Sequence, residues 1–523
     1  MTSGSREGLT NMTIQTHSAL VGDRMSSLAD LFLATDKRNS AIIVPETDTE
    51  IAYGSLSDQV ERLAGCLRRS GLRPGQTVAI ALPNGIEFLV SFLAATRARL
   101  VAAPMNEAYK VEEFRFLLEN SEARVVITTS GTSPIRDAAG ASNLPIWTAR
   151  RTATGDVELS GPGFSSSTKD TPDAPVPEDI AMLMHTSGTT SRPKAVALTH
   201  ANLVASVRNI SAHYALSPAD TGLVVMPLFH GHGLIGATLS SLCAGAKIVL
   251  PERFSAHLFW PMVAGHAVTW YSAVPTIHEI LLVRADSDHA PSRSGLRFVR
   301  SCSSPLSPAT LKRLEDRFAA PVIEAYAMTE TSHQATSNPL PPGVRKPGTV
   351  GRGTNVEVGI MGDGGKLLEA GTQGEVVVRG ETVMHGYSRN PEATRQAFTD
   401  GWFRTGDLGI LDPDGYLRLT GRIKELINRG GEKISPTAVD AVLLGHPAVA
   451  MAASFAVPDP IYGEEIHAAV VPRAEVTAAE LQAYCRSRLS AFEIPKVIHF
   501  VKALPENATG KVDRHQLTRL FSN

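Results

Sequence analysis

Short, continuous apolar runs alternate with stretches of helical periodicity over the first three hundred residues of the chain. Runs at 77–82, 124–128, 246–250 and 297–300 predict buried strands, and the stretch 86–97 predicts a helix. Strands that alternate with helices are typical of parallel sheets covered by helices. The pattern therefore predicts an α/β fold for the larger part of the chain.

The clearest amphipathic helix is expected to begin close to Ser55. The run 55–58, Ser-Leu-Ser-Asp, has the form of a capping box at the start of a helix. Helical spacing then gathers four apolar side chains on one face, where they would meet the core. These are Val60, Leu63, Ala64 and Leu67.

A different pattern begins near residue 355. From 355 to 416, short apolar segments are separated by Gly/Asp turns such as 412–415, which predicts an antiparallel β subdomain. After Gly421 follows a mixed unit of about 100 residues, enough for a small separate domain. We therefore expect a loose tail over 1–24, a large domain over 25–423 with parallel-rich sheets covered by helices plus the β subdomain, and a small α+β domain over 424–523.

Composition excludes several classes of partner. The chain has 523 residues and a formal net charge of −2, so it offers no broad basic field for nucleic acid. No apolar run is long enough to span a membrane, and the first 24 residues lack the apolar core of a signal peptide. The few cysteines are scattered, which favours a reducing, cytoplasmic setting and argues against zinc or disulfides. They are Cys66, Cys243, Cys302 and Cys485.

A hydroxyl-rich loop follows the apolar run that ends near residue 184. The segment 186–194, Thr-Ser-Gly-Thr-Thr-Ser-Arg-Pro-Lys, carries five hydroxyls, one glycine and a terminal lysine. Hydroxyl and backbone donors together with a lysine charge suit phosphate oxygens. The spacing is not that of a Walker A loop. On its own the segment is also compatible with a polar surface loop.

The loop resembles the phosphate-binding signature of the adenylate-forming superfamily, which contains acyl-CoA synthetases, adenylation domains of peptide synthetases, and luciferases. Ser191 and Ala195 stand where that signature commonly has glycine, which stiffens the loop modestly but removes no donor. Four further motifs of the superfamily follow in the expected order, and five motifs in order make a chance match untenable. They are Tyr-Ala-Met-Thr-Glu at 326–330, Trp-Phe-Arg-Thr-Gly-Asp at 402–407, Gly-Arg-Ile-Lys-Glu at 421–425 and Pro-Glu-Asn-Ala-Thr-Gly-Lys at 505–511.

The resemblance implies ATP as substrate and assigns roles to the motif residues. Catalytic roles fall to Lys511, Lys194, Thr329 and Glu330, and Glu330 would also bind Mg²⁺, for which a carboxylate is a suitable hard ligand. Within the nucleotide site, the ring of Tyr326 would stack on adenine. The nucleotide-binding set is Thr186, Ser187, Gly188, Thr189, Thr190, Ser303, Ser304, Pro305, Glu324, Ala325, Tyr326, Ala327, Thr329, Asp407, Arg422 and Lys511.

The same resemblance implies two half-reactions separated by a domain rotation. A carboxylic acid would first attack the α-phosphorus of ATP, giving an acyl-adenylate and pyrophosphate. The small domain would then turn about Lys424, and Gly430 and Gly431 would line the path of a thiol, expected to be coenzyme A. Glycine suits that path because a pantetheine arm must pass close to the backbone. The oligomeric state is left as monomer or dimer.

Three departures from the common superfamily pattern indicate a small, polar acid pocket. The segment 226–233 carries a second histidine, the usual Ser-Gly-Gly-Ala-Pro-Leu becomes Ser-Cys-Ser-Ser-Pro-Leu at 301–306, and Ala327 replaces a glycine. An alkyl chain would meet unfavourable polar walls there, whereas a second carboxylate would find donors. The residues expected to contact the acid are His230, His232, Ser301 and Ser303.

Longer segments of the chain resemble the oxalate–CoA ligases of plants and yeast, and oxalate is inferred from that resemblance. They include 185–194, 270–278, 300–303, 324–330 and 422–435.

Alternatives stay open at this stage. The acid could instead be malonate or a short- or medium-chain fatty acid, the acceptor could be a carrier protein, and the chain could be a non-catalytic nucleotide-binding protein. His232 could be a satisfied core histidine, and Ser301 and Ser303 could be strand-end hydroxyls bonded to nearby backbone.

Overall fold

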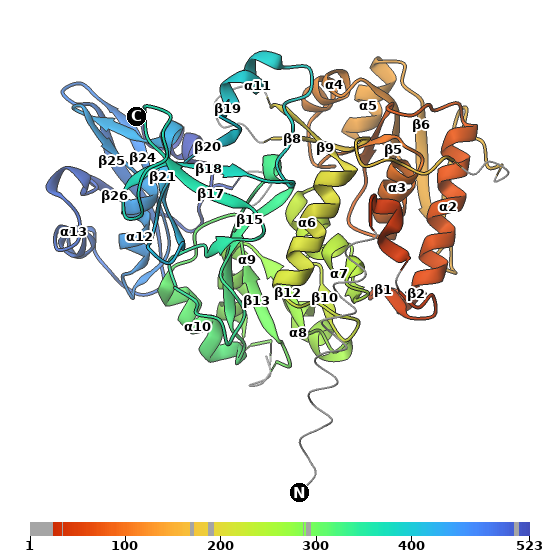
Figure 1. Ribbon diagram of the computed structural model, residues 1–523. Coiled ribbons are helices and arrows are strands. Elements are labelled where there is room, and N and C mark those ends of the chain that lie inside the picture. Colours follow the sequence, from red (N-terminus) through yellow and green to blue (C-terminus); the bar gives the residue numbers. More distant parts are fainter. Residues whose placement is uncertain are drawn as a thin grey trace, which may run out of the picture.

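Two helix-covered sheets form the larger part of the molecule, and the C-terminal elements form a separate unit on the opposite side from the N-terminal strands and helices (Figure 1). The structure is a computed structural model that describes residues 25–33, 35–167, 172–186, 193–285, 287–288, 294–506 and 512–522. The expected tail at 1–24 lies outside the described residues.

The first sheet of the described chain has nine strands in the order β16-β15-β14-β13-β12-β10-β11-β1-β2. Its centre is parallel, and β2, β15 and β16 run antiparallel to their neighbours at the two edges. The strands are β1 (Ser40–Val44), β2 (Thr49–Ala52), β10 (Thr221–Leu223), β11 (Lys247–Val249), β12 (Trp270–Ala273), β13 (Phe298–Ser301), β14 (Val322–Met328), β15 (His333–Ser337) and β16 (Arg352–Gly353).

The second sheet has seven strands in the order β7-β6-β5-β3-β4-β8-β9 among the described residues. It is also parallel at its centre, with β7 and β9 antiparallel at the edges. The strands are β3 (Thr77–Ala81), β4 (Val101–Pro104), β5 (Ala123–Thr128), β6 (Ile146–Arg151), β7 (Val157–Ser160), β8 (Ile180–His185) and β9 (Ala195–Thr199).

Helices from the two halves of the large domain share one apolar core with both sheets. The largest cluster of buried side chains combines residues of α2, α3 and α6 with residues of β1, β3, β5 and β8. Burial of these apolar side chains is the main stabilising contribution to the large domain. The helices of the domain are η1 (Leu28–Phe32), α2 (Tyr53–Arg69), α3 (Ile86–Arg97), α4 (Val111–Asn120), α5 (Pro134–Ala141), α6 (His200–His213), η2 (His232–Leu239), α7 (Ser240–Cys243), α8 (Ala256–Gly265), α9 (Pro275–Arg284), α10 (Pro308–Phe318) and η3 (Thr329–Thr331).

The predicted antiparallel subdomain is present as a third sheet. Its described strands run in the order β17-β18-β20-β19, and β21 pairs with β20. Its elements are β17 (Glu357–Met361), β18 (Gln373–Arg379), α11 (Pro391–Ala397), β19 (Phe398–Thr399), β20 (Trp402–Leu411) and β21 (Leu417–Arg422). Figure 1 shows these strands between the large domain and the C-terminal elements.

The C-terminal unit follows a short connecting helix, η4 (Ile423–Glu425), directly after β21. Its described strands form a fourth sheet in the order β23-β22-β25-β24, with β26 beside β25. The predicted fold class is thereby confirmed, while the boundaries at 24 and 423 stay predictions. The elements are β22 (Ile427–Arg429), β23 (Glu432–Ile434), α12 (Pro436–Leu444), β24 (Val449–Asp459), β25 (Gly463–Pro472), α13 (Ala478–Arg486), η5 (Ala491–Glu493), β26 (Val497–Phe500) and α14 (Arg514–Phe521).

The expected start of the amphipathic helix α2 is wrong by two residues. The helix begins at Tyr53, its N-cap is Ala52, and no side chain caps it. The N–H groups of Tyr53 and Gly54 donate instead to the backbone carbonyls of Asn39 and Lys37, at 2.9 and 2.8 Å. Tertiary partners therefore satisfy the free donors that a capping box would have satisfied. The predicted buried face, Val60, Leu63, Ala64 and Leu67, is confirmed.

Among the described helices, none combines the length and apolar character needed to cross a membrane.

Candidate active site

A cavity of about 490 Å³ lies where the large domain, the antiparallel sheet and the connecting helix η4 meet. The carboxyl ends of β8 and β14 form one side of it, and residues of β20 and η4 form another. In open α/β sheets, ligands bind outside the carboxyl ends of the strands. Predicted site residues that line the cavity are Thr186, Lys194, His230, Ser303, Ala327, Thr329, Glu330, Arg422 and Lys424.

The two ends of the hydroxyl-rich loop are held together at the cavity. The Thr186 N–H donates to the Lys194 carbonyl at 3.0 Å, and the Lys194 N–H lies 3.3 Å from the Thr186 hydroxyl. Residues 187–192 lie outside the described residues, including the predicted Ser187, Gly188, Thr189 and Thr190. Both described ends of the loop, Thr186 and Lys194, line the cavity.

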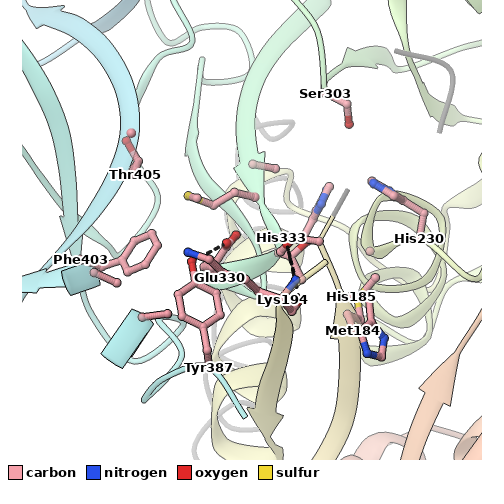
Figure 2. Close-up of a pocket in the computed structure, with 18 of the residues that line it drawn as sticks. Met184, His185, Lys194, His230, Ser303, Glu330, His333, Tyr387, Phe403 and Thr405 are labelled. Atoms are coloured by element: carbon pink, nitrogen blue, oxygen red, sulfur yellow. Dashed lines mark hydrogen bonds between the residues drawn. The ribbon is translucent and has the colours of Figure 1, made fainter. Parts of the chain in front are cut away.

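Glu330 is a buried carboxylate in the wall of the cavity. It is 9% exposed, and the hydroxyl of Tyr387 donates to its Oε1 at 3.0 Å. Burial raises the pKa of the Glu330 carboxyl above its usual range, although Tyr387 and the charges of Arg422 and Lys194 act in the opposite direction. The Lys194 ammonium lies 4.5 Å from the centre of the Tyr387 ring, so these three side chains form one cluster (Figure 2).

The described residues include no group of three or more His, Cys, Asp or Glu side chains that could hold a metal by themselves. A single carboxylate such as Glu330 still suits Mg²⁺, because this ion keeps several waters and takes further oxygens from substrate phosphates. The donor set therefore fits a metal that arrives with the nucleotide.

Asp407 is held by two predicted nucleotide-binding residues. The Tyr326 hydroxyl donates to its Oδ2 at 2.5 Å, and the Arg422 guanidinium donates to its Oδ1 at 2.7 Å. Pairing of β20 with β21 sets Asp407 directly opposite Arg422, which explains the second contact. The three side chains are thereby brought together from segments 81 and 15 residues apart.

Other predicted nucleotide-binding residues support the wall without lining the cavity. Glu324 is buried in β14 and accepts the Gly348 N–H at 3.2 Å, and burial raises the pKa of its carboxyl to about 8. Ala325 is buried beside it, and Ser304 and Pro305 lie in the loop after β13. These four residues are absent from the cavity surface.

Polar side chains from three segments surround one end of the cavity. Figure 2 shows Ser303, His230 and His333 around the same space, away from Phe403 and Thr405. Ser303 has a φ of +73° and His333 a φ of +93°, conformations that non-glycine residues rarely adopt. Backbone strain of this kind concentrates at functional sites.

The other two predicted acid-binding residues lie behind this surface. His232 is fully buried, with Nδ1 at 3.1 Å from the Ser303 hydroxyl and Nε2 at 2.6 Å from the Ser272 hydroxyl. Ser301 is 2% exposed, and its hydroxyl has no hydrogen-bond partner among the described residues. Neither residue lines the cavity.

Sequence reasoning missed His333 and Tyr387, which both line the cavity. His333 follows the Tyr-Ala-Met-Thr-Glu motif by three residues, and this short distance from the motif was the available signal. Tyr387 reaches Glu330 across 57 residues of sequence, and no local pattern marks it.

The predicted hinge and thiol residues lie in or next to the connecting segment. Lys424 belongs to η4 and lines the cavity. Gly430 and Gly431 have φ values of +60° and +98° in the turn between β22 and β23, which explains glycine at both positions. They do not line the cavity. Lys511 lies outside the described residues.

Comparison with known proteins gives consistent matches over almost the whole chain. The family model of AMP-binding enzymes matches residues 33–388, and the model of the AMP-binding enzyme C-terminal domain matches residues 438–511. The chain is 48% identical to an oxalate–CoA ligase of Arabidopsis thaliana, covering 90% of this chain and 93% of that protein. It is 42% identical to an oxalate–CoA ligase of Saccharomyces cerevisiae, covering 95% and 97%.

Among solved structures, ATP-bound MatB from Rhodopseudomonas palustris is similar with a TM-score of 0.86 and 29% sequence identity. The match covers 95% of this chain and 99% of that chain. The similarity therefore includes both the large domain and the C-terminal unit.

Proposed function

This chain belongs to the AMP-binding enzyme family, and on that premise we propose that it activates oxalate with ATP and transfers the oxalyl group to coenzyme A. The enzyme is an AMP-forming acid–thiol ligase. The observation that carries oxalate as the acid is the 48% and 42% identity to two oxalate–CoA ligases over most of their length. The polar end of the cavity at His230, Ser303 and His333 supports it.

In the first half-reaction, one carboxylate oxygen of oxalate attacks the α-phosphorus of ATP and pyrophosphate leaves. Tyr326, Asp407 and Arg422 bind the nucleoside, and Lys194 with the hydroxyl-rich loop binds the phosphates. Mg²⁺ held at Glu330 would neutralise charge on the phosphate oxygens. Because the charge develops on the leaving oxygens, these fixed donors stabilise the transition state more than the bound substrates.

In the second half-reaction, the small domain turns about Lys424 and the thiol of coenzyme A attacks the oxalyl carbonyl, so that AMP leaves. Gly430 and Gly431 then line the thiol path, and Lys511 moves away from the nucleotide. Arg473 of the small domain contacts Glu279 of the large domain at 3.2 Å, and such a rotation would break this ion pair. We place the enzyme in a reducing cytoplasm as a monomer or dimer.

The first experiment is AMP release by purified protein with Mg-ATP and coenzyme A, using oxalate, malonate, acetate, octanoate and palmitate. Oxalate is expected to give a kcat/KM at least about tenfold above any other acid, because a polar end wall penalises alkyl chains. Preferential release with a fatty acid would keep the family and the chemistry but overturn oxalate as the acid.

Variants of Ser303 separate its chemical from its conformational contribution. Ser303→Gly and Ser303→Ala both lose the hydroxyl, so both are expected to lower kcat/KM for oxalate by a similar factor of about 10. The φ of +73° strains alanine but not glycine. Ser303→Gly should therefore be about 1 kcal/mol more stable than Ser303→Ala in urea unfolding. Equal stability of the two variants would show that the backbone relaxes at this position.

A further inference from the structure

Arg300 is a fully buried cation behind the polar end of the cavity, the end formed by His230, Ser303 and His333. It lies on β13, and the pairing of β12 with β13 sets it beside Ser272. Its guanidinium donates to the Tyr214 hydroxyl at 2.9 Å, to the Ser272 hydroxyl at 2.9 Å and to the Gln334 side-chain carbonyl at 2.9 Å. It also lies 3.1 Å from Nε2 of His333.

Every one of these partners is a neutral group. Within the described part of the chain, no carboxylate forms an ion pair with Arg300. Its neighbour Arg297 shows the usual arrangement, because it is paired with Asp220 at 3.0 Å. A buried charge without a counter-charge is costly, so its presence calls for a compensating anion.

The first branch of this network ends at Ser303. A guanidinium only donates, so Ser272 accepts from Arg300 and has its own proton left to donate to Nε2 of His232, 2.6 Å away. Nδ1 of His232 then carries the ring proton and donates to the Ser303 hydroxyl, 3.1 Å away. The Ser303 proton is thereby directed into the cavity that Ser303 lines.

The second branch ends at His333. Because Arg300 donates to Nε2 of His333, the proton of the neutral ring is on Nδ1. Burial and the charge of Arg300 hold the pKa of both His232 and His333 well below their usual range, so both rings are neutral at pH 7. His333 lines the cavity, so this branch also presents a donor to the bound acid.

We propose that Arg300 is a specificity-determining positioning residue that selects a dianionic acid. Arg300 orients the two branches of the hydrogen-bond network so that Ser303 and His333 donate to the carboxylate that does not react. Its positive charge also offsets the negative charge of that carboxylate. The inference rests on the proposed function for the identity of the acid. During adenylation the attacking carboxylate becomes part of a mixed anhydride with AMP as pyrophosphate leaves, while the second carboxylate keeps its charge, so this interaction persists in the transition state.

Oxalate and oxamate form the matched pair of substrates that tests this inference, because oxamate replaces one carboxylate by a neutral amide of the same shape. The measurement is kcat/KM for AMP release with each acid, in wild type and in Arg300→Met. We expect the preference of the wild type for oxalate over oxamate to fall about 10- to 100-fold in the variant, mostly through KM for oxalate. Arg300→Lys, which keeps the charge, should restore part of the preference.

Arg297→Met is the control, because Arg297 precedes the same strand but is paired with Asp220 away from the cavity. It should leave the ratio unchanged. An equal loss for both acids in Arg300→Met would mean a purely structural role and overturn the inference. A wild type that is inactive on oxalate would instead overturn the proposed acid. Malonate and its monoamide would then replace oxalate and oxamate as the pair that tests Arg300. A wild type that prefers neither dianion over its monoamide would contradict the role inferred for Arg300.

Gly236→Ala reaches the same network without removing a buried charge, in case Arg300→Met does not fold. A Cβ at Gly236 would lie 2.3 Å from Nε2 of His333, the atom that Arg300 contacts, so the ring must shift and this contact is disturbed. The oxalate preference should fall in this variant too, while ATP still raises the melting temperature. An unchanged preference in Gly236→Ala would remove the His333 branch.

Discussion

Replacing Lys511 by alanine is expected to lower the rate of adenylate formation at least about 10²-fold while leaving thioester formation from a supplied acyl-adenylate within about twofold of wild type. A lysine ammonium beside the reacting phosphate stabilises charge that exists only in the adenylation transition state. The rotation proposed above removes this lysine before the thiol attacks. The two rates are measured separately, by exchange of labelled pyrophosphate into ATP and by single-turnover transfer from the adenylate to coenzyme A.

Lys502→Ala is the matched control, because Lys502 is an exposed lysine of the same domain. It should leave both rates unchanged. An equal loss in both half-reactions of Lys511→Ala would contradict the division of labour between the two domain positions. Loss of only the thioester step would place Lys511 on the thiol path instead.

The parallel strands and the first long helices were predictable from sequence because their signals are local. The apolar run at 77–82 and the helical stretch at 86–97 appear as β3 and α3, since continuous burial leaves an unbroken apolar pattern. The start of α2 was not predictable, because the carbonyls of Lys37 and Asn39 that replace its cap come from another segment. A local sequence pattern cannot predict a helix start whose free N–H groups are satisfied by a distant segment instead of by a capping side chain.

The residues of the candidate site likewise fall into those that could be named from sequence and those that could not. Motif residues such as Lys194 and Glu330 could be named from sequence because each motif is contiguous. Arg300 could not, because an arginine at the end of an apolar run has the same pattern as a strand that ends at the surface. Only the fold shows that β12 and β15 enclose it. Ser303 was named from sequence as a contact of the acid. Its positive φ, which explains why glycine is common at this position, could be seen only in the structure.

Replacing Glu330 by glutamine is expected to lower adenylation about 10²-fold or more and to raise the Mg²⁺ concentration for half-maximal rate. Glutamine keeps the size of the side chain and can still accept the hydrogen bond from Tyr387, but it lacks the charge that holds the cation. Glu330 is 9% exposed, and its neighbours in the cluster offer a cation no second carboxylate. The measurement is a Mg²⁺ titration of pyrophosphate exchange at saturating ATP.

Tyr387→Phe separates the charge of Glu330 from its placement. This variant keeps the carboxylate and loses only the hydrogen bond of 3.0 Å, so we expect a loss of about tenfold and a small change in Mg²⁺ dependence. An unchanged Mg²⁺ dependence in Glu330→Gln would mean that the cation is bound by the phosphates alone. Glu330 would then act only as the acceptor that holds Tyr387, and Glu330→Gln, which keeps an acceptor, should lose less activity than Tyr387→Phe.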